Sequence, residues 1–206
     1  MFDCTSPIYF EPWGSGISTL DITGGDQRFG SLGWTVGTSY TPHRSVTVKC
    51  SITASSNAVL HVVQEHDCDW WCAKFTGLVG LDKEGSKMLM LSNSVNTATG
   101  PVRVTSGTLA LHPSASWTTA SSVTVTNGTL RLLGDEQIGR KADWYLAGNA
   151  QVEIPSGKVL RGHRLYLKNG DAWEEQCGGD YTSANCPFIK SGTLRVSGSG
   201  LLLLIH

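Results

Sequence analysis

An internal repeat of 21 residues constrains this chain more than any other feature of its sequence. Pairs of apolar residues, separated by one residue within each pair, recur at that interval through the middle of the chain. The first series comprises Val102 and Val104, Val123 and Val125, Trp144 and Leu146, and Leu165 and Leu167. Self-similarity at a fixed period of about 20 to 50 residues marks proteins built from stacked units. We therefore expect an elongated array.

A second series of apolar pairs indicates that each repeat contains two strands joined by a turn. Its members are Leu109 and Leu111, Leu130 and Leu132, and Val152 and Ile154. The turn between the two series reads Ser106-Gly-Thr108 and returns as Asn127-Gly-Thr129. Apolar residues that alternate with other residues, with many Val and Thr, are typical of β-strands. No stretch shows the apolar period of a capped helix, so the sequence predicts an all-β fold.

Two short strands with turns in every repeat predict a right-handed, single-stranded parallel β-helix, a solenoid of about 21 residues per coil. Each coil would bury its apolar residues by stacking on the next coil, about 4.8 Å away. Like side chains would then form columns, and glycine or asparagine at the corners would permit left-handed backbone. The alternative is an antiparallel β-sandwich, although a sandwich requires neither a fixed spacing nor a repeated turn.

The regularity of the repeat divides the chain into three parts. Residues 1–57 hold less regular β coils, residues 58–170 hold the regular coils, and residues 171–206 form the C-terminal end. Asp171–Lys190 shows no strand pattern, so we expect an inserted loop there, with a distorted extra coil as the alternative. The apolar run Leu201–Ile205 is far shorter than the roughly 20 residues that span a bilayer. We interpret it as a last strand that caps the stack.

Composition and the start of the chain exclude several classes of function. Charged residues make up 16% of the chain and the formal net charge is −1, which removes the electrostatic basis for binding nucleic acid or a membrane surface. Residues 1–10 lack the basic and apolar regions of a secretory signal, so we expect a cytosolic protein or the C-terminal part of a longer chain. Phosphate-binding and hydrolase motifs are absent from the sequence. We expect no cofactor.

The repeat is best developed at residues 79–133, where its residues follow a recognisable order. They are Lys83, Gly85, Leu89, Leu91, Asn96, Thr97, Thr99, Gly100, Val104, Gly107, Thr108, Leu109 and Leu111. This pattern resembles the autotransporter-associated β-strand repeat of bacterial secreted and surface proteins. Lys87 stands where that family has a second glycine, and Ala98 replaces an aromatic residue. The resemblance implies an extracellular or cell-surface β-helical passenger or stalk, whose partners would be surface glycans or other cell-surface proteins.

The cysteine and histidine residues are candidates for disulfide bonds and for metal ligands. Cys177 and Cys186 bracket a glycine-rich loop and form a candidate disulfide pair, although six cysteines allow about 15 pairings. The densest group of zinc-type ligands comprises His61, His66, Cys68 and Cys72. On a strand, His61 and Cys72 lie too far apart for one site unless the chain turns between them. We therefore expect no metal site.

Outward aromatic residues are the best candidates for a binding surface. Tyr145 and Tyr166 are 21 residues apart at outward positions, so they would stack on the surface of the helix, and Trp173 follows in the insert. Exposed aromatic side chains bind sugar rings or partner proteins. A structural ladder of aromatic rings that stiffens the sheet is the alternative interpretation.

The acidic residues give little support to an enzyme. A glycosidase needs two carboxylates about 5 to 10 Å apart, and the acidic residues compared across neighbouring coils have no acidic counterpart one coil away. Glu174 and Asp180, both in the insert, are the remaining candidates. We therefore predict a non-catalytic structural stalk, with no catalytic residue. An adhesin or carbohydrate-binding module is the alternative, and a polysaccharide lyase or glycoside hydrolase is the second alternative.

Overall fold

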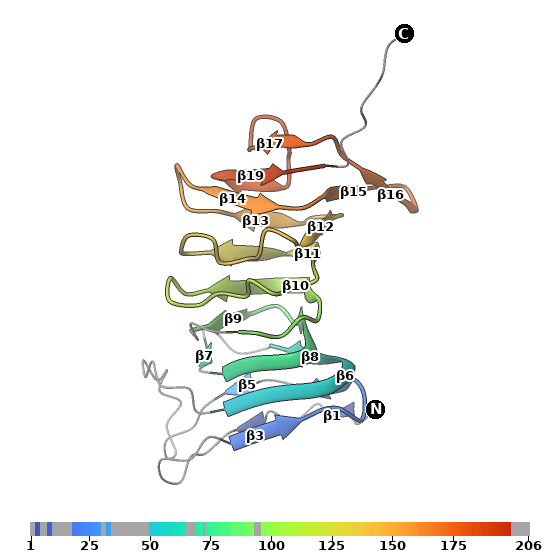
Figure 1. The fold of residues 1–206 in the computed structure, drawn as a ribbon, viewed down its shortest axis with the longest axis vertical. Coiled ribbons are helices and arrows are strands. Elements are labelled where there is room, and N and C mark those ends of the chain that lie inside the picture. Colours follow the sequence, from blue (N-terminus) through green and yellow to red (C-terminus); the bar gives the residue numbers. More distant parts are fainter. Residues whose placement is uncertain are drawn as a thin grey trace.

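The protein is a β-solenoid of about 5 turns that repeat roughly every 21 residues (Figure 1). The computed structural model describes residues 3–4, 8–9, 18–29, 32–33, 50–64, 69–71, 73–92 and 96–198. None of these residues lies in a helix, so the described part of the chain has no helix suited to crossing a membrane. Nearly all pairings between the described strands are parallel, which confirms the β-helix and excludes the antiparallel sandwich.

Most of the described strands are short. In chain order they are β1 (Asp3–Cys4), β2 (Ile8–Tyr9), β3 (Ser18–Asp21), β4 (Gln27–Phe29), β5 (Leu32–Gly33), β6 (Cys50–Val63), β7 (Asp69–Trp71), β8 (Ala73–Glu84), β9 (Met88–Leu91), β10 (Val102–Leu111), β11 (Ser122–Leu132), β12 (Asp143–Leu146), β13 (Gln151–Glu153), β14 (Val159–Gly162), β15 (Leu165–Asn169), β16 (Ala172–Glu175), β17 (Gly179–Tyr181), β18 (Ile189–Ser191) and β19 (Thr193–Val196). The long strands β6, β8, β10 and β11 each pair with neighbours on two faces of the coil.

The first face of each coil carries the register that the repeat predicts. It comprises the C-terminal parts of β6 and β8, the N-terminal parts of β10 and β11, and then β12 and β15. Val102, Val123, Trp144 and Leu165 pair in succession from coil to coil. All four side chains are buried in one continuous core. The predicted column is confirmed.

The second face begins after a sharp corner. Leu109, Leu130 and Val152 stack in register there, as predicted from the second apolar series. The corner of β10 is at Gly107, whose φ of 65° is left-handed and whose added Cβ would lie 2.3 Å from the Gly85 carbonyl oxygen. Gly128 occupies the matching position of β11 without a left-handed φ. The predicted left-handed corner is therefore present in one coil and absent from the next.

A third face, which the apolar pairs did not predict, completes the coil. Phe75 on β8 stacks on Trp117, with ring centroids 4.6 Å apart. The indole Nε1 of Trp117 donates to the carbonyl oxygen of buried Ala98 at 2.8 Å. Asn96 links the neighbouring coils, since its Oδ1 accepts from the Phe75 N–H and its Nδ2 donates to the Ser116 carbonyl oxygen. The small side chain of Ala98 leaves room for the two aromatic rings to meet.

One cationic side chain interrupts the apolar columns. Lys83 is in register with Val104, so it points inward, and it is fully buried. Its Nζ donates to the carbonyl oxygens of Glu84, Gly85 and Ser106 at 2.5, 3.1 and 3.3 Å. A buried ammonium group is tolerated when its protons find acceptors. Lys83 therefore supplies hydrogen-bond donors to backbone carbonyls at the corner between the first and second faces.

Residues 171–190, expected to form an inserted loop, contain strands, and Ile189 of β18 pairs in parallel with Val152 of the second face. Within residues 171–190, β16 pairs antiparallel with β15, and β17 pairs antiparallel with β19. The hexad that ends the chain's repeats places Leu194 on Leu160 of the third face, and not in the column of Leu109. The same turn motif therefore serves a different face at this end. Leu201–Ile205, which we expected to cap the stack, lies outside the described residues.

Candidate functional site

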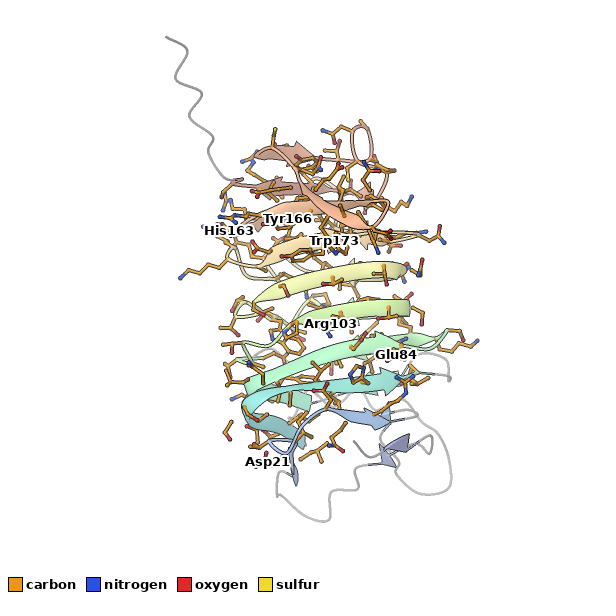
Figure 2. The ribbon with its side chains drawn as sticks, turned by 90° about the vertical axis from the view of Figure 1, so that its right-hand side faces the viewer. Asp21, Glu84, Arg103, His163, Tyr166 and Trp173 are labelled. Carbon is orange, nitrogen blue, oxygen red and sulfur yellow. The ribbon has the colours of Figure 1, made fainter. Side chains whose placement is uncertain are left out.

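The three aromatic residues predicted as a binding surface meet on the outward side of the first face (Figure 2). Tyr145 on β12 and Tyr166 on β15 are in register, and their rings stack with centroids 4.7 Å apart and 7° between planes. The hairpin of β15 and β16 brings the ring of Trp173 edge-on to that of Tyr145, with centroids 5.3 Å apart. We call Tyr145, Tyr166 and Trp173 the aromatic cluster.

The stacking of the rings decides what the aromatic cluster can bind. The facing sides of Tyr145 and Tyr166 cover one another. A sugar ring needs an open aromatic face, so those two sides are closed to it. Trp173 is 39% exposed, and the Nζ of Lys168 lies 6.0 Å from its ring centroid. Trp173 is therefore the member of the cluster that is best placed to meet a ligand.

Charged groups surround the aromatic cluster. A guanidinium nitrogen of Arg164 donates to the Tyr166 hydroxyl at 3.4 Å, and Arg164 Nε lies 3.7 Å from Glu175 Oε1. Burial raises the pKa of the Tyr145 hydroxyl, and the negative charge of Asp143 raises it further. Tyr145 is therefore neutral at physiological pH, and its hydroxyl can donate or accept a hydrogen bond.

The two acidic residues considered for catalysis have structural partners. Both oxygens of Asp180 accept hydrogen bonds from Arg195, at 2.5 and 2.7 Å, and these bonds lower the pKa of Asp180. Glu174 accepts a hydrogen bond from the side-chain amide of Asn169 at 2.8 Å. A carboxylate held ionised by an arginine is poorly suited to act as a general acid near neutral pH. The geometry gives no support to either residue as a catalyst.

The predicted disulfide between Cys177 and Cys186 is not formed, because both residues are free thiols. Cys186 is buried in the apolar core, whereas Cys177 is exposed. Tyr181 lies beside both cysteines, and its hydroxyl donates to the Cys177 carbonyl oxygen at 2.5 Å. The prediction relied on the length of the loop between the cysteines. Loop length does not determine whether the two Cβ atoms point toward one another.

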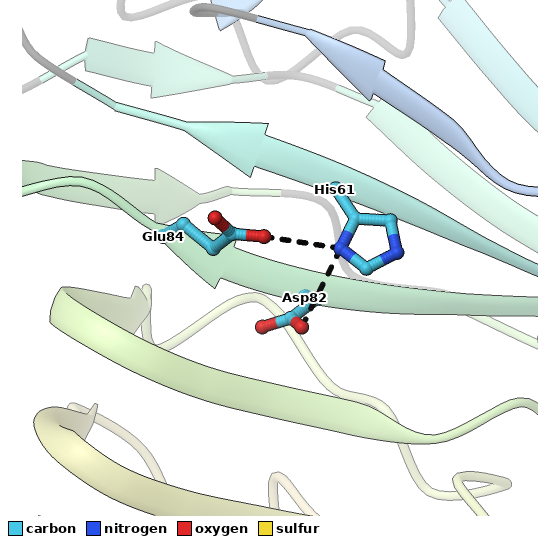
Figure 3. A group of neighbouring side chains, drawn as sticks. All are labelled: His61, Asp82 and Glu84. Atoms are coloured by element: carbon cyan, nitrogen blue, oxygen red, sulfur yellow. Dashed lines mark hydrogen bonds and ion pairs between the residues drawn. The ribbon is translucent and has the colours of Figure 1, made fainter. Parts of the chain in front are cut away.

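A second group of polar side chains lies on the first face near its N-terminal end (Figure 3). His61 on β6 is in register with Asp82 on β8, and Glu84 points to the same side two residues later. His61 Nδ1 lies 3.1 Å from Glu84 Oε1 and 3.5 Å from Asp82 Oδ2. We call these three residues the histidine cluster. Sequence reasoning grouped His61 with other residues and missed this cluster; the 21-residue step relates His61 to Asp82 but does not by itself bring their side chains together.

Neighbouring side chains hold both carboxylates of the histidine cluster. Thr105 Oγ1 donates to Asp82 Oδ1 at 2.8 Å. Arg28 donates to Glu84 Oε1 at 2.7 Å and to the other oxygen as well. Burial acts to raise the pKa of Glu84, but the hydrogen bonds and charges of Arg28 and His61 lower it overall. The other zinc-type ligands considered from the sequence, His66, Cys68 and Cys72, lie outside the described residues.

Comparison of the chain with protein-family models, with curated proteins and with solved structures gave no match. The likeness to the autotransporter-associated repeat therefore remains a resemblance of motifs. Fold alone does not determine function. The features of this structure that bear on function are the stacked apolar columns of the core, the aromatic cluster and the histidine cluster.

Proposed function

We propose that this chain is a non-catalytic structural segment, a stalk, of a bacterial secreted or cell-surface protein. The observation that supports this proposal is the unbroken register of the first face from Leu60 through Val102 to Leu165, in which every residue of that column is buried. Each coil covers the apolar face of the next, so the coils support one another along a single axis. An elongated body of this kind is suited to holding attached domains apart.

The stiffness of the stalk comes from backbone pairing that runs along the stack. In β10 and β11, pairing continues from Val102↔Val123 through Gly107↔Gly128 to Leu111↔Leu132. Bending the stack would stretch these hydrogen bonds on one face and open the close-packed core on another. We therefore expect the chain to behave in solution as a short, rigid rod.

Two measurements test the stalk proposal. Small-angle X-ray scattering of the purified chain should give an elongated, rigid particle, and antibodies raised against the chain should label intact cells of the source organism. A compact or highly flexible particle would contradict the structural role. Labelling that appears only after the cells are broken open would contradict the surface location.

Carbohydrate binding at the aromatic cluster is the second candidate function. The observation that favours it is the exposed Trp173, which lies beside the cation of Lys168 and against the ring of Tyr145. An aromatic ring with a nearby charge can pack against the apolar side of a sugar while the charge binds its polar groups. In this interpretation the two tyrosines position Trp173, and Trp173 makes the contact.

A glycan array with matched variants tests this second function. We expect Trp173→Ala to abolish glycan binding, and Tyr145→Ala combined with Tyr166→Ala to weaken it by disturbing the support of Trp173. Leu78→Ala is the control, since Leu78 is a similarly exposed apolar residue, 38% exposed, outside the cluster. Absence of binding in the native chain, or binding that survives Trp173→Ala, would remove the carbohydrate function and leave the stalk proposal untouched.

A further inference from the structure

The histidine cluster brings three potential metal ligands to one point. His61 Nδ1, Asp82 Oδ2 and Glu84 Oε1 all lie within 4.8 Å of one another. Two ligands that are each about 2.0 to 2.2 Å from one metal ion lie roughly 3 to 3.5 Å apart. The distances from His61 Nδ1 to the two carboxylates, 3.1 and 3.5 Å, fall in this range. The imidazole nitrogen is therefore already spaced from both carboxylates as the ligands of one ion would be.

Asp82 is largely buried, and only one of its two carboxylate oxygens receives a hydrogen bond from a described residue. The residue is 8% exposed, and its side chain is 11% exposed. Thr105 satisfies Oδ1, but within the described part of the chain Oδ2 receives no hydrogen bond and faces His61 Nδ1 at 3.5 Å. Taking most of a carboxylate out of water without a hydrogen-bond donor to replace the water has an energetic cost. A cation between Oδ2 and the histidine would remove that cost.

The charged groups around the histidine cluster also favour the binding of a cation. Asp82 and Glu84 carry negative charges, and Asp26 Oδ2 lies 3.9 Å from the other ring nitrogen of His61. Arg28 forms an ion pair with Glu84, whereas Arg103, in register with Asp82 on the next coil, makes no ion pair within the described residues. Three carboxylates thus face one paired guanidinium. The excess of negative charge suits a divalent cation.

We propose that His61 Nδ1, Asp82 Oδ2 and Glu84 Oε1 bind a divalent transition-metal ion. One imidazole with two carboxylates is a donor set for ions such as Zn²⁺, Mn²⁺ or Co²⁺, whereas Ca²⁺ and Mg²⁺ prefer oxygen ligands alone. The ion would join β6 to β8, which are adjacent coils. It would therefore clamp the solenoid near its N-terminal end, a role that does not depend on whether the chain serves as a stalk.

The neighbours of the three ligands have the arrangement of an outer coordination shell. A metal-bound histidine commonly donates from its second ring nitrogen to a carboxylate, and Asp26 Oδ2 lies 3.9 Å from that nitrogen of His61, as an ion pair and not as a hydrogen bond. Thr105 donates to the second oxygen of Asp82, and Arg28 donates to both oxygens of Glu84, including Oε1 at 2.7 Å. Loss of such a partner typically weakens metal affinity about 10- to 100-fold. Thr105→Ala should therefore weaken binding although Thr105 is not itself a ligand.

Cobalt binding to the full chain tests the proposal, because the absorption spectrum of Co²⁺ distinguishes thiolate ligands from nitrogen and oxygen ligands. After removal of metals with a chelator, we expect the chain to bind one equivalent of Co²⁺ with no thiolate charge-transfer band. Asp82→Asn, Glu84→Gln and His61→Ala should each weaken binding at least about tenfold. Asp82→Asn retains the oxygen that Thr105 bonds, so its fold should persist, and circular dichroism checks this.

His163→Ala is the matched control. His163 also pairs with a carboxylate, since its Nδ1 lies 2.8 Å from Asp143 Oδ1, but no second carboxylate is paired with it in the described structure. Its removal should leave Co²⁺ affinity unchanged. Co²⁺ should raise the unfolding midpoint of the native chain and of His163→Ala, but not that of Asp82→Asn. A thiolate spectrum, equal binding by the native chain and Asp82→Asn, or no binding at millimolar Co²⁺ would each overturn the proposal.

Discussion

The inward and outward residues of the first face differ in how closely their side chains repeat from one coil to the next. Inward, Val102 and Val123 occupy successive coils of one column. Outward, Arg103, Thr124 and Tyr145 are in register one above another, and they share neither charge nor size. Each inward side chain must fill space between the coils above and below it, whereas an outward side chain has only to fit the strand. The inside therefore sets stability, and the outside is free to acquire binding groups.

The largest difference between inward and outward positions should appear when the same charge is placed on each side of one strand. Val123→Asp should cost about 4 kcal/mol or more, because it buries a carboxylate without a partner. Thr124→Asp, at the next and outward position, should change the free energy of unfolding by about 1 kcal/mol or less. Urea unfolding of the two variants measures the difference. Equal losses would show that the outward positions are as constrained as the core.

Two glycines with left-handed backbone allow a position packed against the neighbouring coil to be compared with an open position. Gly107 and Gly157 both have left-handed φ, 65° and 74°. An added Cβ at Gly107 would lie 2.3 Å from the Gly85 carbonyl oxygen, whereas at Gly157 it would meet nothing within 4 Å. Gly157→Ala should therefore cost only the conformational strain, about 1 to 2 kcal/mol. Gly107→Ala should cost clearly more, which thermal unfolding of the pair would reveal. Similar losses would mean that the stacked corner can relax.

The difference between inward and outward positions also explains how much of the structure the sequence could predict. The Val102 and Leu109 columns were predictable because inward positions repeat their chemistry at a fixed interval. The third face was not, because its residues at the same interval, Phe75, Asn96, Trp117 and Ile138, are single positions of differing chemistry and not alternating apolar pairs. The histidine cluster was missed because outward residues repeat a position without repeating a residue type. Interval alone relates His61 to Asp82, and nothing in the sequence indicates that their side chains converge.

Two buried tryptophans separate the contribution of packing from that of hydrogen bonding inside the solenoid. Trp117 and Trp144 are both fully buried. Trp117 Nε1 donates to the Ala98 carbonyl oxygen, whereas Trp144 Nε1 has no hydrogen-bond partner within the described structure. Both changes to phenylalanine remove similar volume, but only Trp117→Phe breaks a hydrogen bond, and the Ala98 carbonyl oxygen still accepts one from Thr119 Oγ1 at 2.8 Å. We expect Trp117→Phe to cost about 0.5 to 1.5 kcal/mol more than Trp144→Phe in urea unfolding, the net contribution of one hydrogen bond. An equal cost would assign the whole effect to packing.

The smallest expected effect compares two carboxylates on the outside of the solenoid. The pKa values of Glu84 and Asp180 are both lowered, and each carboxylate accepts hydrogen bonds from an arginine, Arg28 or Arg195. A lowered folded-state pKa means that the ionised group stabilises the fold above its unfolded pKa. That stability is lost as the pH falls from there through the folded-state pKa. Both carboxylates should therefore make the chain less stable in acid.

Salt distinguishes these two contributions, because Glu84 is partly buried and Asp180 is not. Glu84→Gln should reduce the acid-induced loss of stability between about pH 6 and about pH 3 by about 1 kcal/mol or less. Asp180→Asn should reduce it in low salt, and the difference from the native chain should disappear in about 1 M salt, where exposed pairs are screened. Denaturant unfolding across this pH range, with transition-metal ions chelated, measures both. A Glu84 effect that disappears in salt as completely as that of Asp180 would place the histidine cluster among ordinary surface ion pairs.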